Sequence, residues 1–371
     1  MNSLKVLSIF GTRPEAVKMA PVVRELARTH GIDAKVCVTA QHREMLDQVL
    51  DIFEITPDID LNLMQPGQSL AALTARVFMH LEPILIDFQP DWVLVQGDTT
   101  TVMAAALLAY YHQIKVGHIE AGLRTGDKFQ PFPEEINRRV AGVVADLHFA
   151  PTEWSRQNLQ RENTPDERII VTGNPAIDAL HWVMQQPFDI NTLNIPSIGS
   201  SDVQTVLITA HRRENFGRPL ENICRAIKTL ADHYAGAVHF VYPVHLNPNV
   251  QKPAFRILGN QSQVTLLPPL DYLSLVNVMK DAAIVLTDSG GIQEEAPGLG
   301  IPTLVLRETT ERPEGVQAGT LKLIGTEQDV IIAETRRLLD DHEAHSAMAG
   351  AKNPYGDGHA AERIVSALLD F

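Results

Sequence analysis

Two acidic residues follow segments of the sequence that have the character of buried strands. Asp98 comes just after one apolar run, and Glu120 ends the next. Because the carboxyl ends of parallel strands meet at one edge of a sheet, we expect both carboxylates at that edge. Glu134 opens a predicted helix after a proline and adds a third carboxylate. Carboxylates that converge from three elements favour acid/base chemistry.

Simpler structural explanations exist for some of these residues. Asp98 could serve only as the N-cap of the helix that follows it. Acidic residues also suit the first turn of a helix, and Glu135 can pair with Arg139 at i,i+4, which explains Glu135. Neither explanation covers Glu120 at a strand end. Arg138, one turn after Glu134, is expected to support the carboxylates as a neighbouring positive charge.

The second half of the sequence contains a glycine turn between a strand and a helix. Ser289, Gly290 and Gly291 follow a strand that ends at Asp288. Exposed backbone N–H groups in such a turn can hold a phosphate, and Glu295 one turn later can reach a ribose diol. The alternative is a turn chosen only for its backbone dihedral angles, which leaves the serine and the glutamate unexplained.

Positive charges follow strands in both halves. Arg13 and Lys18 come after the first strand, His211 and Arg212 follow a strand of the second half, and Arg312 lies further on. Such groups can bind a diphosphate, although each could also be a solvated surface cation. The GxGxxG, HExxH and CxxC patterns are absent from the sequence, so we expect neither a dinucleotide redox cofactor nor a catalytic metal.

Short apolar runs alternate with helix-length segments along the whole chain. This rhythm predicts parallel sheets covered by helices on both faces, and hence an α/β fold of two doubly wound domains facing a ligand-binding cleft. The predicted strands are 5–10, 34–39, 92–96, 115–120, 147–150, 205–209, 238–242, 264–266, 284–287 and 303–306. The predicted helices include 16–30, 69–87, 100–111, 220–233, 272–281 and 328–339. Residues 187–202, rich in Pro, Ser, Asn and Gly, are predicted to be a loop between the two halves.

The composition limits the class of protein. The chain has 371 residues and a formal net charge of −14, which argues against a general nucleic-acid binder. Cys37 and Cys224 are expected to be buried thiols. The start of the chain lacks signal-peptide features, and no apolar run is long enough to span a bilayer, so we expect a cytoplasmic protein with no membrane partner.

Ten segments in order resemble the non-hydrolysing UDP-N-acetylglucosamine 2-epimerases of bacteria, in particular the enterobacterial members. The resemblance runs from about Lys5 to about Ile364. The segments are FGTRPEAVKMAP, TAQHREMLDQVL, QGDTTT, GHIEAGLRTGD, FPEEINR, HRRENFG, YPVHLNPNV, TDSGGIQEEAPGLG, TTERPE and NPYGDG.

This resemblance implies a fold, a reaction and roles for the site residues. The fold is the two-Rossmann-domain arrangement called GT-B, with residues 1–172 and the C-terminal helix 356–371 in the first domain and 173–355 in the second. The reaction is reversible C2 epimerisation of UDP-N-acetylglucosamine, without a cofactor. The implied catalytic residues are Asp98, Glu120, Glu134 and His211. The implied substrate-binding residues are Arg13, Lys18, Arg138, Ser289, Gly290, Gly291, Glu295 and Arg312.

The family also implies regulation by a second UDP-N-acetylglucosamine, bound near Gln41, Glu44, Arg212 and His245. It further implies a homodimer, for which the apolar faces of the helices near Met45 and Leu73 offer contacts. Four features depart from the common pattern: Gln96, Ala210, Leu275 and the segment GNPAID. Two related activities stay open at this point, a GT-B glycosyltransferase and a hydrolysing epimerase. The residues also do not decide which carboxylate removes the C2 proton and which returns it.

Overall fold

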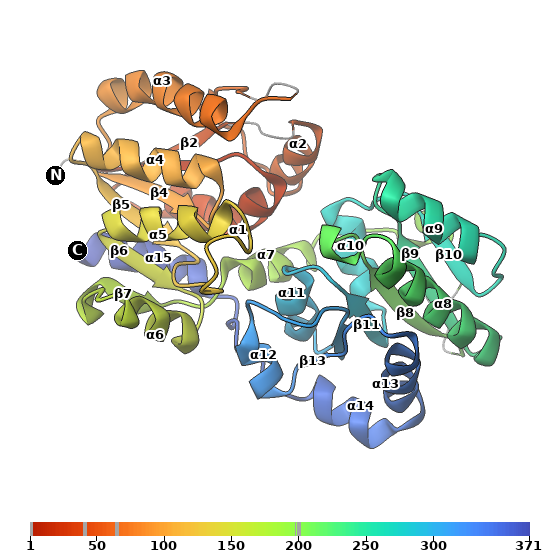
Figure 1. The fold of residues 1–371 in the computed structure, drawn as a ribbon. Helices are drawn as coiled ribbons and strands as arrows, with labels where there is room; N and C mark the ends of the chain where they lie inside the picture. Colours follow the sequence, from red (N-terminus) through yellow and green to blue (C-terminus); the bar gives the residue numbers. More distant parts are fainter. Residues whose placement is uncertain (1–2, 40–42, 64–66, 197, 199–201) are drawn as a thin grey trace. The chain divides into compact units, whose positions relative to one another are not determined.

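The computed structural model describes residues 3–39, 43–63, 67–196, 198 and 202–371, with the side chains of residues 43–45 excepted. The chain forms two compact units. The N-terminal unit comprises Met1–His181 and Tyr355–Phe371, and the C-terminal unit comprises Trp182–Pro354. Each unit is a parallel sheet with helices around it (Figure 1).

The boundary between the units lies inside helix α7 (Pro175–Val183), later than the predicted boundary after residue 172. The start of α7 is tied to the N-terminal unit by two contacts. The backbone N–H of Asn174 donates to the carbonyl of Tyr355 at 2.7 Å, and Asp178 Oδ1 accepts from the N–H of Ala361 at 2.8 Å. The predicted linker, residues 187–202, therefore belongs to the C-terminal unit.

The sheet of the N-terminal unit has the strand order β3-β2-β1-β4-β5-β6-β7, all parallel. Its strands are β1 (Leu4–Phe10), β2 (Ile32–Val38), β3 (Ile59–Asp60), β4 (Trp92–Gln96), β5 (Lys115–Ile119), β6 (Leu147–Ala150) and β7 (Ile169–Val171). The strand order reverses between β1 and β4: β2 and β3 lie on one side of β1, and β4 to β7 lie on the other. This position is the topological switch point, where α/β proteins bind ligands.

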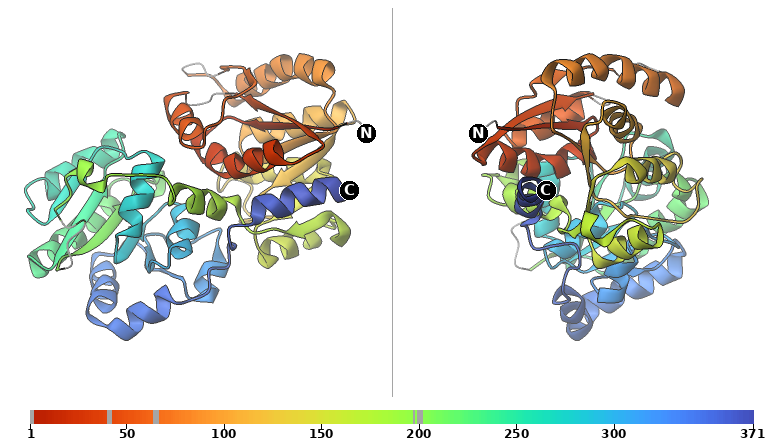
Figure 2. Two further views of the ribbon diagram at one scale, coloured as in Figure 1. Left: turned by 180° about the vertical axis from the view of Figure 1, so that it is seen from behind. Right: turned by 90° about the vertical axis from the view of Figure 1, so that its left-hand side faces the viewer.

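Helices cover both faces of this sheet. The helices are α1 (Arg13–Arg28), α2 (Arg43–Ile52), α3 (Leu70–Phe88), α4 (Thr100–Tyr111), α5 (Glu134–Val144), α6 (Glu153–Arg161), the start of α7 and α15 (Ala360–Asp370). Within this unit, α3, α4 and α5 pack side by side on one face, and α1 packs against α15 on the other (Figures 1 and 2). The C-terminal residues of the chain thus return to the N-terminal unit.

Continuous apolar runs form the core because both faces of a parallel sheet are buried. All five residues of β4 are buried, and α4 buries apolar residues around most of its circumference. Leu73 itself is part of this core and only 5% exposed, and the side chain of Met45 lies outside the described residues. Cys37 and Cys224 are buried free thiols, as predicted.

The C-terminal unit repeats the pattern with the strand order β10-β9-β8-β11-β12-β13. Its strands are β8 (Gln204–Thr209), β9 (Val238–Pro243), β10 (Val264–Leu267), β11 (Ile284–Thr287), β12 (Thr303–Val305) and β13 (Leu321–Leu323). Its helices are α8 (Arg218–His233), α9 (Pro248–Leu258), α10 (Tyr272–Lys280), α11 (Ile292–Gly298), α12 (Pro313–Ala318), α13 (Gln328–Asp340) and α14 (His342–Ala349). Here the switch point lies between β8 and β11.

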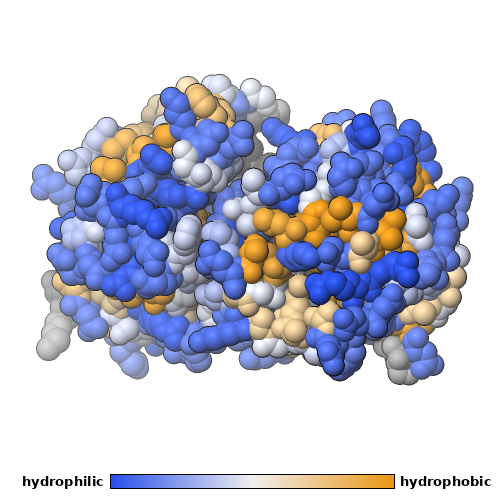
Figure 3. Space-filling model, turned by 60° about the horizontal axis from the view of Figure 1, so that its bottom comes forward, coloured by the Kyte–Doolittle hydropathy of each residue, from blue (hydrophilic) through white to orange (hydrophobic). Residues whose placement is uncertain are grey.

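The face of the molecule in Figure 3 is mostly hydrophilic, with apolar side chains gathered in limited areas. Among the described residues, no helix is both long and apolar enough to cross a membrane.

Candidate functional site

Asp98 lies in the turn between β4 and α4, at the switch point of the N-terminal unit. The N-cap of α4 is Thr99, whose side chain accepts from the N–H of Val102, so Asp98 does not serve as the cap. Its Oδ2 instead accepts from Arg138 Nε at 2.9 Å and from Nη2 at 2.6 Å. Asn137 Nδ2 donates to the carbonyl of Asp98 at 2.9 Å, so the start of α5 fixes both backbone and side chain of this turn.

Glu120 follows β5 directly, and its backbone has a φ of 62°. A left-handed conformation is uncommon for a glutamate and often marks a functional position. The side chain is buried and is held by donors from three other elements. Lys18 of α1 and Gln96 of β4 bind its two oxygens, and Asn174 Nδ2 donates to Oε1 at 3.0 Å.

One departure from the family pattern, Gln96, falls on these contacts, and another, the segment GNPAID, contains one of them. Gln96 and Asn174, the latter in the segment GNPAID, are both ligands of Glu120. Gly97 joins Gln96 to Asp98 with a φ of 81°, and a Cβ there would lie 3.4 Å from Glu120 Oε2. The sequence GDTTT therefore gives a turn in which Asp98 and Glu120 emerge from neighbouring strands at one edge, as predicted.

Glu135 has a larger structural role than the one predicted. The pair with Arg139 exists at 3.4 Å, but the side chain of Glu135 is fully buried. It also binds Arg138 Nη1 at 3.0 Å and accepts from the N–H groups of Thr125 and Gly126 at 3.2 and 3.3 Å. Glu135 thus holds the loop after β5 and orients Arg138 toward Asp98.

Arg138 binds the carboxylates of both Asp98 and Glu135. Burial lowers the pKa of its guanidinium, but Asp98 and Glu135 outweigh that effect and raise the pKa above its ordinary value. The third predicted carboxylate, Glu134, is the first residue of α5 and lies one turn before Arg138.

Arg13 and Lys18 lie on α1, which begins after β1 on the other side of the switch point. Glu15 lies between them and was not predicted as a site residue, although TRPE carries the capping-box pattern. Glu15 is buried and accepts from the N–H groups of Gly11 and Thr12 at 2.9 and 2.7 Å. Its other oxygen accepts from Thr99 Oγ1 at 2.6 Å, which ties the turn after β1 to the turn that carries Asp98. Burial raises the pKa of Glu15.

A buried histidine also supports this edge and was not predicted. His118 of β5 contacts the carbonyl of Gly97 through Nε2 at 2.7 Å. Burial lowers the pKa of His118 to about 4, so its imidazole is neutral at pH 7.

In the C-terminal unit, Asp288 organises the loop after β8. It is fully buried and accepts from the N–H groups of His211 and Arg212, the closest at 2.9 and 2.8 Å, and from Asn215 Nδ2 at 2.9 Å. Asp288 follows β11, so it joins the two strands of the second switch point. From the sequence, Asp288 was predicted only as the residue at which a strand ends.

The turn Ser289–Gly291 lies against two guanidinium groups. A Cβ on Gly290 would lie 2.9 Å from Arg312 Nη1 and 3.3 Å from Arg212 Nη2, so a larger residue would displace the guanidinium of Arg312. Arg312 is held in turn by the buried carboxylate of Glu294. The arrangement of backbone N–H groups and two cations suits a phosphate. Nearby, Tyr272 Oη donates to Glu295 Oε1 at 3.3 Å.

His211 stacks on His245, with ring centroids 5.4 Å apart. Burial lowers the pKa of His211. Of the four residues expected at a regulatory site, His245 and Arg212 therefore lie beside residues expected to bind the substrate nucleotide. The side chain of Glu44 and all of Gln41 lie outside the described residues. Within the described part of the chain, no three His, Cys, Asp or Glu residues are grouped as a metal site.

Two Rossmann-like domains, each with polar and charged residues at its switch point, place the protein in the GT-B class of folds. The family model for UDP-N-acetylglucosamine 2-epimerase matches residues 24–369. The chain belongs to this family.

Individual relatives agree with that assignment. The chain is 56% identical to UDP-N-acetylglucosamine 2-epimerase of Escherichia coli O157:H7 over 98% of both chains. The crystal structure of UDP-GlcNAc 2-epimerase from Neisseria meningitidis bound to UDP-GlcNAc has a TM-score of 0.91 and 50% identity, over 99% of this chain and all of that one. The Methanocaldococcus jannaschii enzyme in complex with UDP-GlcNAc and UDP has a TM-score of 0.82 and 33% identity, over 99% of this chain and all of that one.

Proposed function

We propose that this protein interconverts UDP-N-acetylglucosamine and UDP-N-acetylmannosamine by inverting C2 of the sugar. Family membership supports the substrate, and one observation supports the chemistry. Asp98 and Glu120 emerge from neighbouring strands at the switch point, and each is fixed by a positive charge. Fixed carboxylates at the edge of a ligand-binding sheet are suited to moving a proton to and from a bound sugar.

The chemistry explains why more than one carboxylate is needed. The C2 proton is not adjacent to a carbonyl group and is only weakly acidic. Cleavage of the C1–O bond gives C1 positive character, so a carboxylate can take the C2 proton while UDP leaves with the bonding electrons. The products of this step are 2-acetamidoglucal and UDP. Re-addition of UDP with proton delivery to the opposite face of C2 completes the inversion, and one carboxylate cannot serve both faces.

We assign the sugar chemistry to Asp98, Glu120 and Glu134, with Arg138 as the group that positions Asp98. Lys18 and Arg13 add positive charge on the α1 side. The fully buried Glu135 and the capping Glu15 are positioning residues, since their contacts are to protein groups that hold the site.

We assign UDP binding to residues of the C-terminal unit. The N–H groups of Ser289–Gly291 and the guanidinium of Arg312 suit a diphosphate, and Glu295 suits the ribose diol. The lowered pKa of His211 favours the neutral imidazole, which can donate one hydrogen bond to the diphosphate. Preorganised donors of this kind stabilise the leaving group.

We also propose the finer expectations of the family for this chain. A second UDP-N-acetylglucosamine would act as activator near Arg212 and His245. The enzyme would work in the cytoplasm and supply bacterial surface polysaccharide synthesis.

A homodimer would use exposed apolar residues of the packed helices α3 and α4. Met79 and Tyr111 are 70% and 61% exposed. Sedimentation of the Met79→Glu variant tests this interface. The variant should shift the monomer–dimer equilibrium toward monomer.

The proposed function is tested by incubation with UDP-N-acetylglucosamine in heavy water, followed by NMR at C2. We expect deuterium at C2 of UDP-N-acetylmannosamine and in part of the recovered substrate. A glycosyltransferase would form no epimer without an acceptor, and a hydrolysing epimerase would release free N-acetylmannosamine faster than the nucleotide sugar. Product without deuterium would refute the proton-transfer mechanism.

A further inference from the structure

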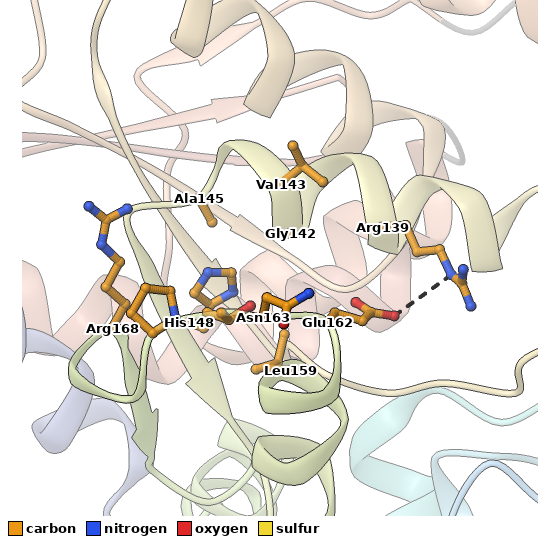
Figure 4. A pocket seen from close by; sticks show the side chains of 11 residues that line it. Arg139, Gly142, Val143, Ala145, His148, Leu159, Glu162, Asn163 and Arg168 are labelled. Carbon is orange, nitrogen blue, oxygen red and sulfur yellow. Dashed lines mark ion pairs between the residues drawn. The ribbon is translucent and has the colours of Figure 1, made fainter.

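A hollow of about 510 Å³ lies on the N-terminal unit between α5 and the segment from the end of α6 to β7 (Figure 4). Its volume is in the range of small-molecule sites. None of its residues was assigned a role in the reaction. The lining residues are Arg139, Gly142, Val143, Ala145, His148, Leu159, Glu162, Asn163, Thr164, Pro165 and Arg168.

The imidazole of His148 lines this hollow, between Arg168 on one side and Glu162 and Arg139 on the other (Figure 4). His148 is only 1% exposed, and its Nδ1 has no hydrogen-bond partner among the described residues. The ring also interacts with the backbone of Ala145. A buried polar atom without a partner is costly, so a group that binds Nδ1 would be favoured here.

The ring of His148 is neutral at pH 7, because burial lowers its pKa to about 3. In a neutral imidazole, one nitrogen donates and the other accepts, and the tautomer decides which. A hydroxyl group can both donate and accept, so it satisfies Nδ1 in either tautomer.

Positive charge dominates the rim. The carboxylate of Glu162 is already bound by Arg124 through two hydrogen bonds of 2.9 and 2.7 Å, and Arg139 Nε lies 3.9 Å from it. Within the residues the structure describes, the guanidinium of Arg168 forms no ion pair. The charged lining residues are Arg139, Arg168 and Glu162, and because Arg124 offsets the charge of Glu162, the hollow favours an anion.

We propose that this hollow binds a small anion that also carries a hydroxyl group, such as the phosphate monoester of a polyol or sugar. The anionic group would lie between Arg168 and Arg139. The hydroxyl group would bind Nδ1 of His148, with Asn163 and Thr164 as further polar partners.

The hollow is connected to the catalytic edge through two series of contacts. His148 and His118 are register partners on neighbouring strands, and His118 Nε2 contacts the carbonyl of Gly97 next to Asp98. Arg139 binds Glu135, which in turn binds Arg138. A bound anion that draws Arg139 away from Glu135 would therefore change how Arg138 holds Asp98, and we infer that occupancy alters turnover. This second part rests on the proposed function.

Binding is tested by NMR on protein with isotope-labelled histidines at pH 7.5, saturated with UDP so that phosphate sites of the C-terminal unit are occupied. Glycerol 3-phosphate and inorganic phosphate are titrated at constant ionic strength, and the His148 resonance is followed. We expect a saturable shift in the millimolar range, with glycerol 3-phosphate binding more tightly because it carries hydroxyl groups. The Arg168→Gln variant should bind glycerol 3-phosphate at least about fivefold more weakly.

The matched control is Arg156→Gln, which removes an arginine of α6 that pairs with Asp166 and does not line the hollow. It should bind like the wild type. No saturable shift of His148, or equal affinities in wild type and Arg168→Gln, would overturn the binding site.

The coupling is tested separately by kinetics. Glycerol 3-phosphate should change kcat of the wild type and leave kcat of Arg168→Gln unchanged. A site that binds without any change in kcat refutes the coupling and leaves the binding site standing. Binding by a protein without epimerase activity would refute the proposed function instead.

Discussion

Acidification is expected to destabilise the N-terminal unit through two buried histidines. His118 and His148 are register partners on β5 and β6, and each is 1% exposed. Burial lowers the pKa from 6.5 to about 4 for His118 and to about 3 for His148. The perturbation is a change from pH 7 to pH 5, applied to the wild type and to the His148→Gln variant.

The sign follows from proton binding. Below pH 6.5 the unfolded chain protonates both histidines, whereas the folded unit keeps them neutral until about pH 4 and pH 3. The unfolded state therefore binds more protons, and stability falls as pH falls through this window. One pKa unit corresponds to about 1.4 kcal/mol, so the free energy of unfolding at pH 5 is lower by about 2 kcal/mol for each histidine.

Hydrogen–deuterium exchange of peptides that cover β5 and β6 measures this effect within one unit. After correction for intrinsic exchange rates, protection in the wild type should fall more steeply between pH 7 and pH 5 than in His148→Gln. The decrease in the protection factor from pH 7 to pH 5 should be about 30-fold larger in the wild type, which corresponds to about 2 kcal/mol. Carboxylates that titrate in both proteins cancel in this comparison.

The reasoning has a direct control. An NMR titration of the His148 imidazole in the folded protein should show no protonation above pH 5. Protonation near pH 6.5, or equal pH dependence of protection in the wild type and the variant, would show that burial does not keep this histidine neutral.

Three substitutions test the assignment of the site. Glu120→Gln should lower turnover by orders of magnitude and leave UDP affinity in calorimetry nearly unchanged, and a parallel loss of affinity would assign Glu120 to binding instead. Arg138→Lys should lower kcat about tenfold to hundredfold, because it removes one charge-assisted hydrogen bond to Asp98 that contributes about 1.5–3 kcal/mol. A change in KM alone would contradict a positioning role. Gly290→Ala should weaken UDP binding by about tenfold, because its Cβ would lie 2.9 Å from Arg312 Nη1, and an unchanged Kd would exclude this turn from the diphosphate site.

The apolar runs were sufficient to predict the longer strands and the fold class. β4, β6 and β11 have the predicted bounds, β2 differs by one or two residues at both ends, and the other predicted strands differ by one residue at one end. The strands β3, β7 and β13 have only two or three residues, too few for a pattern of period two or a recognisable apolar run. The expectation that Asp98 and Glu120 share one sheet edge is confirmed by the pairing of β4 with β5.

Contacts between distant segments were the part that local patterns could not predict. The i,i+4 spacing with Arg139 explained Glu135 locally and concealed its contacts with the loop at Thr125 and Gly126. His118 and Asp288 appeared only as parts of strands, because a buried polar side chain in an apolar run gives no sign of its partner. Glu120 was predicted as the last residue of a strand, but its positive φ ends the strand one residue earlier.

The contacts around Glu120 explain how the fold stabilises the left-handed backbone conformation of this residue. A non-glycine residue in the left-handed region costs on the order of 1–3 kcal/mol and persists only where its surroundings determine it. Here the donors are Lys18 from α1, Gln96 from β4 and Asn174 from the turn before α7. Each comes from a different element, so the loss of one leaves two that still hold the carboxylate. The strained backbone and the buried charge are therefore stabilised together by the sheet edge as a whole, which fixes the carboxylate in the position that the proposed proton transfer at a bound sugar requires.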